Sequence, residues 1–145
     1  MATDRKAEVT WHGDLMSGSG RIDSVSSGAI GGLDVDWVAR SEDAQSKTSP
    51  EELIAAAHSS CFAMALSNEV AKAGGTPVAL DITADVTLGQ VDGAPTITTI
   101  QLTVRGEVEG LDAAGFEQAA QAAKAGCPVS KALTGVEITV DAALE

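Results

Sequence analysis

Apolar and polar residues alternate along several segments of this 145-residue chain, the pattern of β-strands with one buried face. The alternation is cleanest at residues 80–88, where apolar residues at every second position are separated by aspartate and threonine. A longer strand is predicted at residues 96–108, with a bulge near Thr98 and Thr99 because Ile97 is out of phase. Asp92-Gly93 between them predicts a hairpin turn in a loop longer than two residues. Further strands are predicted at residues 9–11, 21–25, 33–38 and 136–142.

Apolar residues recur at helical spacing in the segments between these strands. The first helix is predicted to begin at Pro50, with Ser49 as its N-cap, and to stop at Gly74-Gly75. Asp112 is predicted to cap a second helix that runs to about residue 125, and a short third helix is predicted at residues 128–134. Residues 41–49 are polar and are expected to form a loop. This order of elements predicts an α+β fold in one domain, residues 1–145.

The middle of the first helix consists almost entirely of small or apolar residues, which is typical of a helix buried on most sides. One small domain can hardly bury such a helix alone, so we expect a homodimer that covers it. Phe62 and Met64 are predicted to be core residues on this helix more than pocket residues, although both roles are compatible. The chain has only two phenylalanines, two tryptophans and no tyrosine, so aliphatic residues must build most of the core.

Composition and charge exclude several classes of partner. The formal net charge is −12, from 21 acidic and 9 basic residues, which repels nucleic acid and anionic membranes. The first six residues lead into no apolar core of a signal peptide, and the most apolar segment, residues 53–66, is too short to span a bilayer. We therefore expect a cytoplasmic protein with reduced thiols.

The two cysteines, Cys61 and Cys127, are the main candidates for chemistry. Widely separated cysteines in a chain with no sign of secretion indicate redox chemistry more than a structural disulfide. Cys127 precedes Pro128 and is predicted to be the N-cap of a short helix, a position that favours the thiolate. Cys61 lies within a helix and needs a nearby cation. His58, three residues earlier, shares its helix face, but an arginine carries a permanent charge and is the better candidate.

Several other interpretations remain open at this point. Free cysteine is most often a small buried apolar residue, and His58 is expected more often in packing than in catalysis. The two cysteines with His12 and His58 make four potential metal ligands, but without the close pairs typical of zinc sites. A cysteine hydrolase would need a histidine base oriented by a third group, and no such partner is evident.

Two motifs resemble those of the OsmC/Ohr family. Residues 48–66, TSPEELIAAAHSSCFAMAL, resemble the first cysteine motif of that family, and residues 124–133, KAGCPVSKAL, resemble the second. The order and separation of the two motifs match the family, and the likeness extends over almost the whole chain. The residues around the two cysteines are more similar to the OsmC branch than to the Ohr branch. The resemblance implies a mostly antiparallel sheet around a long buried central helix, in an intertwined homodimer with active sites at the subunit interface.

The resemblance also implies thiol-dependent reduction of organic hydroperoxides, with Cys61 as the peroxidatic cysteine and Cys127 as the resolving cysteine that forms a disulfide with it. No haem, flavin or metal is implied, and an external dithiol is the expected reductant. Hydrogen peroxide is a further potential substrate. The alternative function is a non-enzymatic, redox-sensitive stress or small-ligand-binding domain.

The family's arginine and glutamate are matched by Arg40 and Glu51, with Arg21 as a competitor because the Ohr branch takes its arginine from an earlier segment. Arg40 is favoured to hold Cys61 as thiolate, with Glu51 orienting Arg40. Ten helical residues span about 15 Å, so Glu51 cannot touch Cys61 of its own helix. It acts through the arginine or across the dimer.

Overall fold

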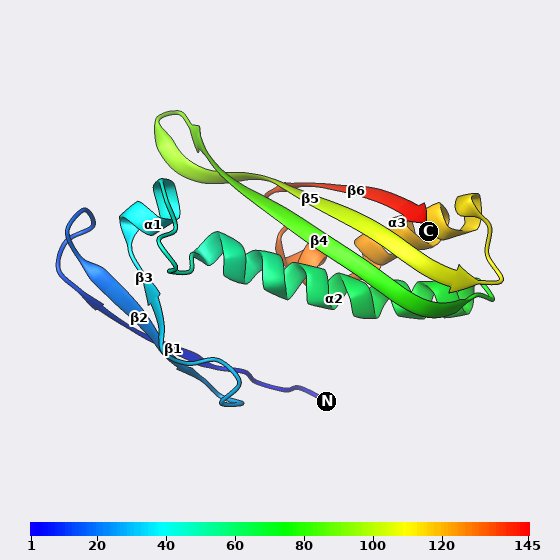
Figure 1. The fold of residues 1–145 in the computed structure, drawn as a ribbon, viewed down its shortest axis with the longest axis horizontal. Coiled ribbons are helices and arrows are strands. Elements are labelled where there is room, and N and C mark those ends of the chain that lie inside the picture. Colours follow the sequence, from blue (N-terminus) through cyan, green and yellow to red (C-terminus); the bar gives the residue numbers. More distant parts are fainter. The chain divides into compact units, whose positions relative to one another are not determined.

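The computed structural model describes residues 1–145, which form two compact units, residues 1–53 and residues 54–145. Figure 1 shows the elements of both units in chain order. The prediction of one domain over the whole chain stays a prediction. None of the helices combines the length and the apolar character needed to cross a lipid bilayer.

The N-terminal unit contains a three-stranded antiparallel sheet and a short helix. Its elements are β1 (Ala7–His12), β2 (Ser19–Val25), β3 (Leu33–Val35) and α1 (Trp37–Ser41). The strands lie in the order β1-β2-β3, and every residue of β1 is exposed. The three short strands predicted in this part of the chain are therefore present.

The third of these strands is shorter than predicted. The alternation of residues 33–38 favoured one strand, but β3 ends at Val35 and α1 begins at Trp37. Asp36 is the N-cap of α1, and its Oδ1 atom accepts a hydrogen bond from the backbone N–H of Ala39 at 2.7 Å. An aspartate that satisfies a free backbone donor stabilises the start of a helix. As a result Arg40 lies on a helix, and not at the end of a strand.

The C-terminal unit consists of a three-stranded sheet and helices packed against it. The helix α2 (Pro50–Lys72) has its first turn in the N-terminal unit and the rest in this one. The other elements are β4 (Thr76–Val91), β5 (Ala94–Glu109), α3 (Ala113–Gly126), α4 (Pro128–Ala132) and β6 (Glu137–Leu144). β4 pairs antiparallel with β5, and β6 pairs parallel with β5. A parallel neighbour needs a crossover connection, which α3 and α4 supply.

Local sequence signals set the ends of these elements. Ser49 Oγ accepts from the Glu52 N–H at the start of α2, and Gly74, with φ of +88°, follows its end. Asp112 Oδ1 accepts from the Gly115 N–H and caps α3 as predicted. These residues satisfy free helix-end groups or adopt a left-handed conformation that favours glycine.

The hairpin between β4 and β5 is tighter than predicted. Val91 pairs with Ala94, so the turn consists of Asp92 and Gly93 alone. Both have positive φ, 51° and 79°, as a two-residue turn matched to the twist of a hairpin requires. The predicted longer loop is wrong, because the flanking strands extend to the turn. The predicted bulge is confirmed: the register shifts so that Thr98 is the extra residue of β5.

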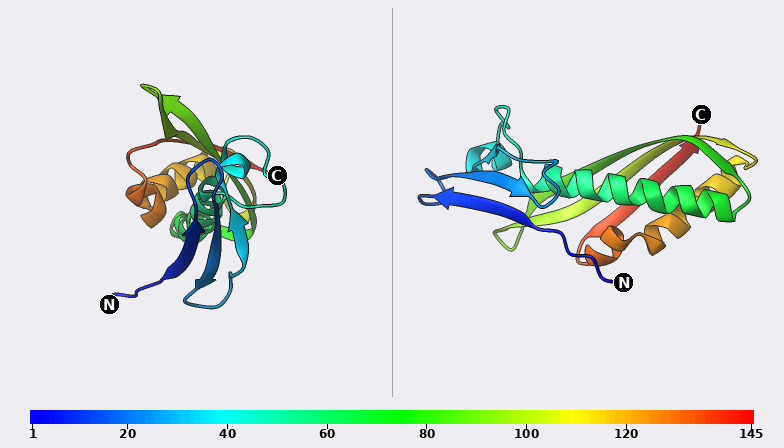
Figure 2. Two further views of the ribbon diagram at one scale, coloured as in Figure 1. Left: turned by 90° about the vertical axis from the view of Figure 1, so that its left-hand side faces the viewer. Right: turned by 90° about the horizontal axis from the view of Figure 1, so that it is seen from below.

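The core lies between one face of this sheet and two helices, α2 and α3, which lie side by side against that face (Figure 2). Its most buried members are Phe62, Leu66 and Val70 of α2, Ile100, Leu102 and Val104 of β5, and Phe116, Ala119, Ala120 and Ala123 of α3. The apolar positions predicted from strand alternation supply the sheet side of this core, and the predicted apolar side of the second helix is the buried side of α3.

Only one side of α2 is buried within the single chain. The buried residues His58, Phe62, Leu66 and Val70 recur every fourth position. The opposite side exposes small or apolar residues, among them Ala56, Ala57, Ser60 and Met64. The prediction of a helix buried on most sides therefore needs a partner chain to cover this side.

Gly106 of β5 allows the closest approach in this core. A Cβ atom added to it would lie 2.4 Å from Cζ of Phe116. We expect Gly106→Ala to lower the free energy of unfolding by about 1–3 kcal/mol, because the ring must shift within a packed core. Urea unfolding measures this loss. Gly135→Ala, where an added Cβ meets nothing within 4 Å, should change stability by less than about 0.5 kcal/mol. Equal stabilities of the two variants would contradict the packing described here.

Candidate active site

The two cysteines lie together in the C-terminal unit. Cys61 lies about halfway along α2, and Cys127 lies in the bend between α3 and α4. Their sulfur atoms are 3.3 Å apart, and both are free thiols. Cys127 is fully buried, while Cys61 is partly exposed. A disulfide bond is about 2.05 Å long, so a small movement suffices to join the sulfurs.

The bend that contains Cys127 is fixed by backbone hydrogen bonds on both sides. Its N–H donates to the carbonyl of Ala123 at 2.8 Å, and its carbonyl accepts from the N–H of Lys131 at 3.0 Å. Cys127 is therefore both the C-cap of α3 and the N-cap of α4, with Pro128 as the first residue of α4. The predicted N-cap position is confirmed, although the sulfur makes no well-aligned capping hydrogen bond.

The surroundings of Cys127 favour its thiolate. Burial alone would raise the pKa of this thiol, but the polar hydrogens around the sulfur outweigh it and the net shift is downward. These hydrogens belong to the Ser130 backbone and hydroxyl, the Cys61 thiol and the Val129 backbone. Groups that interact with the charged form lower the pKa of an acid.

The surroundings of Cys61 have the opposite effect. Burial raises the pKa of Cys61, the Val129 N–H opposes it in part, and the neighbouring Cys127 raises it further. Two thiols in contact titrate as a pair, and here the first negative charge falls on Cys127. Arg105, the one arginine of the C-terminal unit, is paired with Asp141 at 3.2 Å. An arginine beside Cys61, the cation favoured by the sequence, would therefore have to come from outside this unit.

Arg40 and Glu51 form an ion pair within the N-terminal unit. Arg40 Nη2 lies 2.8 Å from Glu51 Oε1, and Nε lies 3.1 Å and 3.2 Å from the two carboxylate oxygens. Glu51 is 7% exposed, and the guanidinium lies 5.8 Å from the ring centroid of Trp37. A contact through two nitrogens fixes the plane of a guanidinium. The structure thus brings the predicted arginine and glutamate together in one chain.

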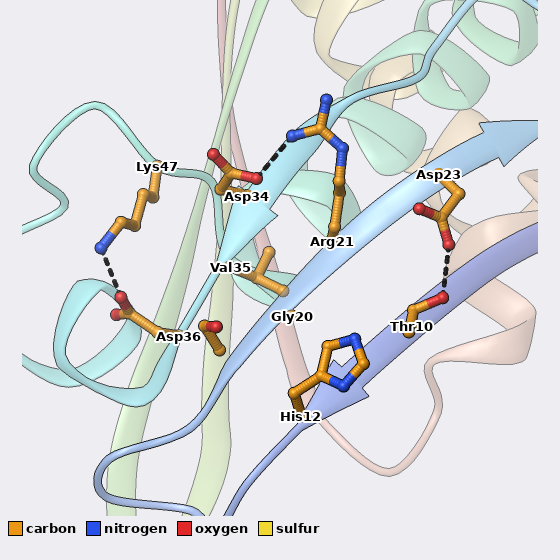
Figure 3. A pocket seen from close by; sticks show the side chains of 10 residues that line it. Thr10, His12, Gly20, Arg21, Asp23, Asp34, Val35, Asp36 and Lys47 are labelled. Atoms are coloured by element: carbon orange, nitrogen blue, oxygen red, sulfur yellow. Dashed lines mark hydrogen bonds and ion pairs between the residues drawn. The ribbon is translucent and has the colours of Figure 1, made fainter.

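Arg21, the competing arginine, has different surroundings. It lies on β2 and pairs with Asp34 at 2.8 Å, with more than half of each side chain exposed. Figure 3 shows this pair in an open cavity of about 480 Å³ on the N-terminal sheet, with further polar pairs around it. His12 lines the same cavity. No three histidine, cysteine, aspartate or glutamate side chains gather in an arrangement that could hold a metal ion.

A buried contact between His58 and Ser130 was missed by the sequence analysis. His58 Nε2 lies 2.7 Å from Ser130 Oγ, and the two residues are 0% and 5% exposed. Burial lowers the pKa of His58, so its ring is neutral at pH 7. The other ring nitrogen, Nδ1, is buried without a partner. The available signal was spacing: His58 precedes Cys61 by three residues, and Ser130 follows Cys127 by three, so each shares a helix face with a cysteine.

A cavity of about 470 Å³ opens beside Cys61, and its size is typical of small-molecule sites. Met64, Ala65, Ala123 and Pro128 supply apolar lining, and Asn68, Glu69 and Lys72 supply polar lining. Phe62 is fully buried in the core as predicted. The favoured core position of Met64 is wrong, because Met64 is 70% exposed, and it lines this cavity as the pocket alternative expected. Helical spacing could not separate these two neighbours, which lie on different sides of α2.

Comparison with known proteins identifies relatives of this arrangement. The sequence profile of the family described as OsmC-like protein matches residues 42–141. The chain is 44% identical over 141 residues to peroxiredoxin OsmC of Escherichia coli, covering 97% of this chain and 96% of the relative. It is 32% identical over 105 residues to the organic hydroperoxide resistance protein OhrA of Bacillus subtilis, covering 72% and 73%. The crystal structure of OhrB of B. subtilis superposes with a TM-score of 0.73, at 26% identity over 94% of this chain and 97% of the other.

His58 makes a testable contribution to the pH dependence of stability. Its pKa in the folded protein lies below the ordinary 6.5, so below that pH the unfolded chain binds a proton that the folded chain does not. Stability should therefore fall as the pH falls, by at most about 1.4 kcal/mol per pH unit from this group. Urea unfolding at about pH 7.5 and about pH 5.5 measures the loss. His58→Gln should flatten the dependence, and equal slopes in both proteins would contradict the assignment.

Proposed function

This chain belongs to the OsmC family of cysteine-based peroxidases, and we propose that it reduces organic hydroperoxides through a Cys61 sulfenic acid and a Cys61–Cys127 disulfide. The observation that carries the proposal is the 3.3 Å contact between the two sulfurs, with the partly exposed one opening onto a cavity. Exposure suits Cys61 to meet the peroxide, and burial suits Cys127 to act only afterwards.

The first step is nucleophilic attack on the peroxide. The Cys61 thiolate attacks the distal oxygen of the hydroperoxide R–O–OH, so that a sulfur–oxygen bond forms as the oxygen–oxygen bond breaks. The electron pair of that bond leaves on the alkoxide, which takes up a proton and departs as the alcohol. Cys61 is left as a sulfenic acid, which further peroxide would oxidise irreversibly.

The second step protects Cys61 and resets the enzyme. The Cys127 sulfur attacks the Cys61 sulfenic sulfur, a disulfide forms, and the hydroxyl leaves as water with the thiol proton. An external dithiol then reduces the disulfide by two exchange reactions and is itself oxidised to a disulfide. The proposed cycle uses the two cysteines and no further cofactor. Its return to thiols suits the reducing cytoplasm predicted from the sequence.

Arg40 is the proposed activator of Cys61. In the C-terminal unit the negative charge of the thiol pair falls on Cys127, so attack by Cys61 needs a cation that moves the charge to it. Arg40 carries a permanent charge, and the buried Glu51 fixes the plane of its guanidinium. We infer that assembly of a homodimer completes the site by bringing such an arginine against Cys61.

Two exposed surfaces support the homodimer. The uncovered side of α2 exposes Ala56, Ala57 and Met64, and β1 exposes Val9 and Trp11. Monomeric proteins rarely leave such apolar surfaces open to water. Nucleic acid and membranes are not proposed as partners, because the net charge of −12 repels both.

The cavity beside Cys61 supports an organic substrate over hydrogen peroxide. Met64, Ala65, Ala123 and Pro128 line it, and its volume of about 470 Å³ far exceeds the needs of two oxygen atoms. An apolar R group buried there leaves water and stabilises the complex. The relative OhrA is named for resistance to organic hydroperoxides, in agreement with this choice.

Substitution of each cysteine tests the cycle. Cys61→Ser should abolish consumption of cumene hydroperoxide in the presence of a dithiol, because no nucleophile remains. Without the dithiol, Cys127→Ser should consume about one equivalent per subunit as Cys61 becomes sulfenic acid, then about one more, slowly, as it becomes sulfinic acid, and then stop. Peroxide loss and the mass of the protein measure both outcomes.

Retained steady-state turnover in Cys61→Ser would remove the mechanism. The alternative function, a non-enzymatic redox-sensitive or ligand-binding domain, predicts that neither substitution changes a rate that is already negligible in the wild-type protein. The wild-type rate therefore decides between the two functions before either variant is made.

Removal of the proposed activator has a separate signature. In a Cys127→Ser background, Arg40→Ala should raise the pKa of Cys61 by about one to three units and slow the peroxide step at neutral pH. The rate of iodoacetamide alkylation as a function of pH measures the pKa. Arg21→Ala is the matched control and should leave the titration unchanged. A shift caused by Arg21→Ala and not by Arg40→Ala would show that the wrong arginine was chosen.

A further inference from the structure

His58 and Ser130 form a polar pair next to Cys127 inside the C-terminal unit, with His58 Nε2 2.7 Å from Ser130 Oγ. Cys127 is the N-cap of α4 and Ser130 follows in its first turn, so the Ser130 hydroxyl lies within one helical turn of Cys127 and is one of the groups that favour the Cys127 thiolate. His58 and Ser130 are almost completely buried. The proposed peroxide step uses neither residue, and a buried polar pair inside a core of alanine, valine and phenylalanine requires an explanation.

The unpartnered Nδ1 atom of His58 determines which ring nitrogen carries the proton. The ring is neutral, so it has one N–H and one acceptor nitrogen. A proton on Nδ1 would leave a buried N–H donor unpaired, whereas a proton on Nε2 leaves only a lone pair unpaired. Unpaired buried donors are the rarer and more costly case. The proton therefore lies on Nε2, and Nε2–H donates to Ser130 Oγ.

The direction of the hydrogen bond from His58 to Ser130 determines where the Ser130 hydroxyl hydrogen can point. Because the Ser130 oxygen accepts from His58, its own hydroxyl hydrogen is free to point at the Cys127 sulfur. A hydroxyl that donates to sulfur stabilises the thiolate over the thiol. The reverse tautomer would draw the hydroxyl hydrogen toward His58 and present a lone pair to Cys127, which favours the thiol.

We propose that His58 is a positioning residue that turns the Ser130 hydroxyl toward Cys127, and that the pair thereby sets the reactivity of the resolving cysteine. The inference rests on the proposed function, in which Cys127 attacks the Cys61 sulfenic acid. The balance of that step is unchanged: the sulfur–sulfur bond forms, the sulfur–oxygen bond breaks, and the Cys127 proton leaves in the water. His58 and Ser130 gain and lose no proton. They stabilise the attacking charge, and they stabilise Cys127 again as leaving group when the dithiol opens the disulfide.

The reactivity of Cys61 and that of Cys127 are therefore set by different neighbouring groups. The titratable group in contact with the Cys127 sulfur is Cys61 of α2, and His58 of the same helix acts through Ser130 of α4. The proposed arginine favours the charge on Cys61, and the His58–Ser130 pair favours it on Cys127. Loss of the His58–Ser130 pair should therefore slow resolution without slowing the formation of sulfenic acid.

The first experiment measures the pKa of Cys127 without any peroxide chemistry. In the Cys61→Ser variant, the pH dependence of iodoacetamide alkylation reports on Cys127 alone. Added Ser130→Ala should raise the pKa by about one unit, the loss of one hydrogen bond to a charged group. Added His58→Leu should raise it similarly, whereas His58→Gln, which keeps a donor near the Nε2 position, and Ser130→Thr, which keeps the hydroxyl, should restore it. His12→Gln is the matched control on an exposed histidine.

The second experiment follows the two chemical steps in chains that keep both cysteines. After mixing with one equivalent of cumene hydroperoxide, Ser130→Ala should form sulfenic acid no more slowly than the wild-type protein and the disulfide about tenfold more slowly at neutral pH. Trapping of the sulfenic acid with dimedone and mass analysis separate the steps. Nitrogen NMR of the two histidines should show His58 protonated at Nε2.

Each outcome of these experiments supports or overturns the proposed role of His58 and Ser130. An unchanged Cys127 pKa in Ser130→Ala, or His58 protonated at Nδ1, would overturn the inference. Failure of His58→Gln to restore the pKa would reduce His58 to a packing residue and would also overturn it. If the pKa shifts as expected but the wild-type protein does not consume peroxide, the proposed function fails and the assignment of the pair stands.

Discussion

The contact between the Cys61 and Cys127 sulfurs depends on how closely α2 can approach the bend between α3 and α4. The buried side of α3 consists of Phe116 and three alanines, so its last turns present no bulk toward the neighbouring helix. Alanine at these positions places no long side chain between the helices, so side chains as short as cysteine can meet. The scarcity of aromatic residues, which leaves most of the core to aliphatic side chains, is compatible with this packing.

Proximity creates an electrostatic problem that the rest of the site must solve. Two thiols in contact cannot both ionise easily, and burial disfavours the charge on either. Within the C-terminal unit the charge falls on Cys127, which suits the resolving step but not the attack on peroxide. The first step of the cycle therefore requires a cation near Cys61. The cation can stay in place during the second step, because the Cys61 sulfenic acid no longer competes with Cys127 for the negative charge. The Arg40–Glu51 pair and the His58–Ser130 pair are the two proposed answers, one for each cysteine.

The sequence was sufficient for features that local chemistry determines. The caps Ser49 and Asp112, the stop at Gly74 and the bulge at Thr98 all follow from short-range rules, and the structure confirms them. It was insufficient where one residue decides between two local patterns. Asp36 ended a strand pattern that would otherwise have continued through Trp37, and the strands on either side of Asp92-Gly93 extended further than their alternation showed.

Long-range contacts set a different limit. The link between His58 and Ser130 joins residues 72 positions apart, and the spacing within each motif places each residue near a cysteine without showing that the two meet. The contact between Cys61 and Cys127 could be predicted only from the resemblance to a family. The same holds for the ion pair of Arg40 with Glu51. Such contacts follow from the packing of helices against a sheet, which one sequence without its fold does not specify.

One measurement tests the central claim most directly: reduced protein mixed with one equivalent of cumene hydroperoxide, with thiols counted and mass determined after a short reaction. The account predicts rapid loss of both thiols, a mass lower by two hydrogen atoms, and a peptide that joins Cys61 to Cys127. Thiols that persist, or a Cys61 that gains oxygen atoms while Cys127 stays reduced, would contradict it.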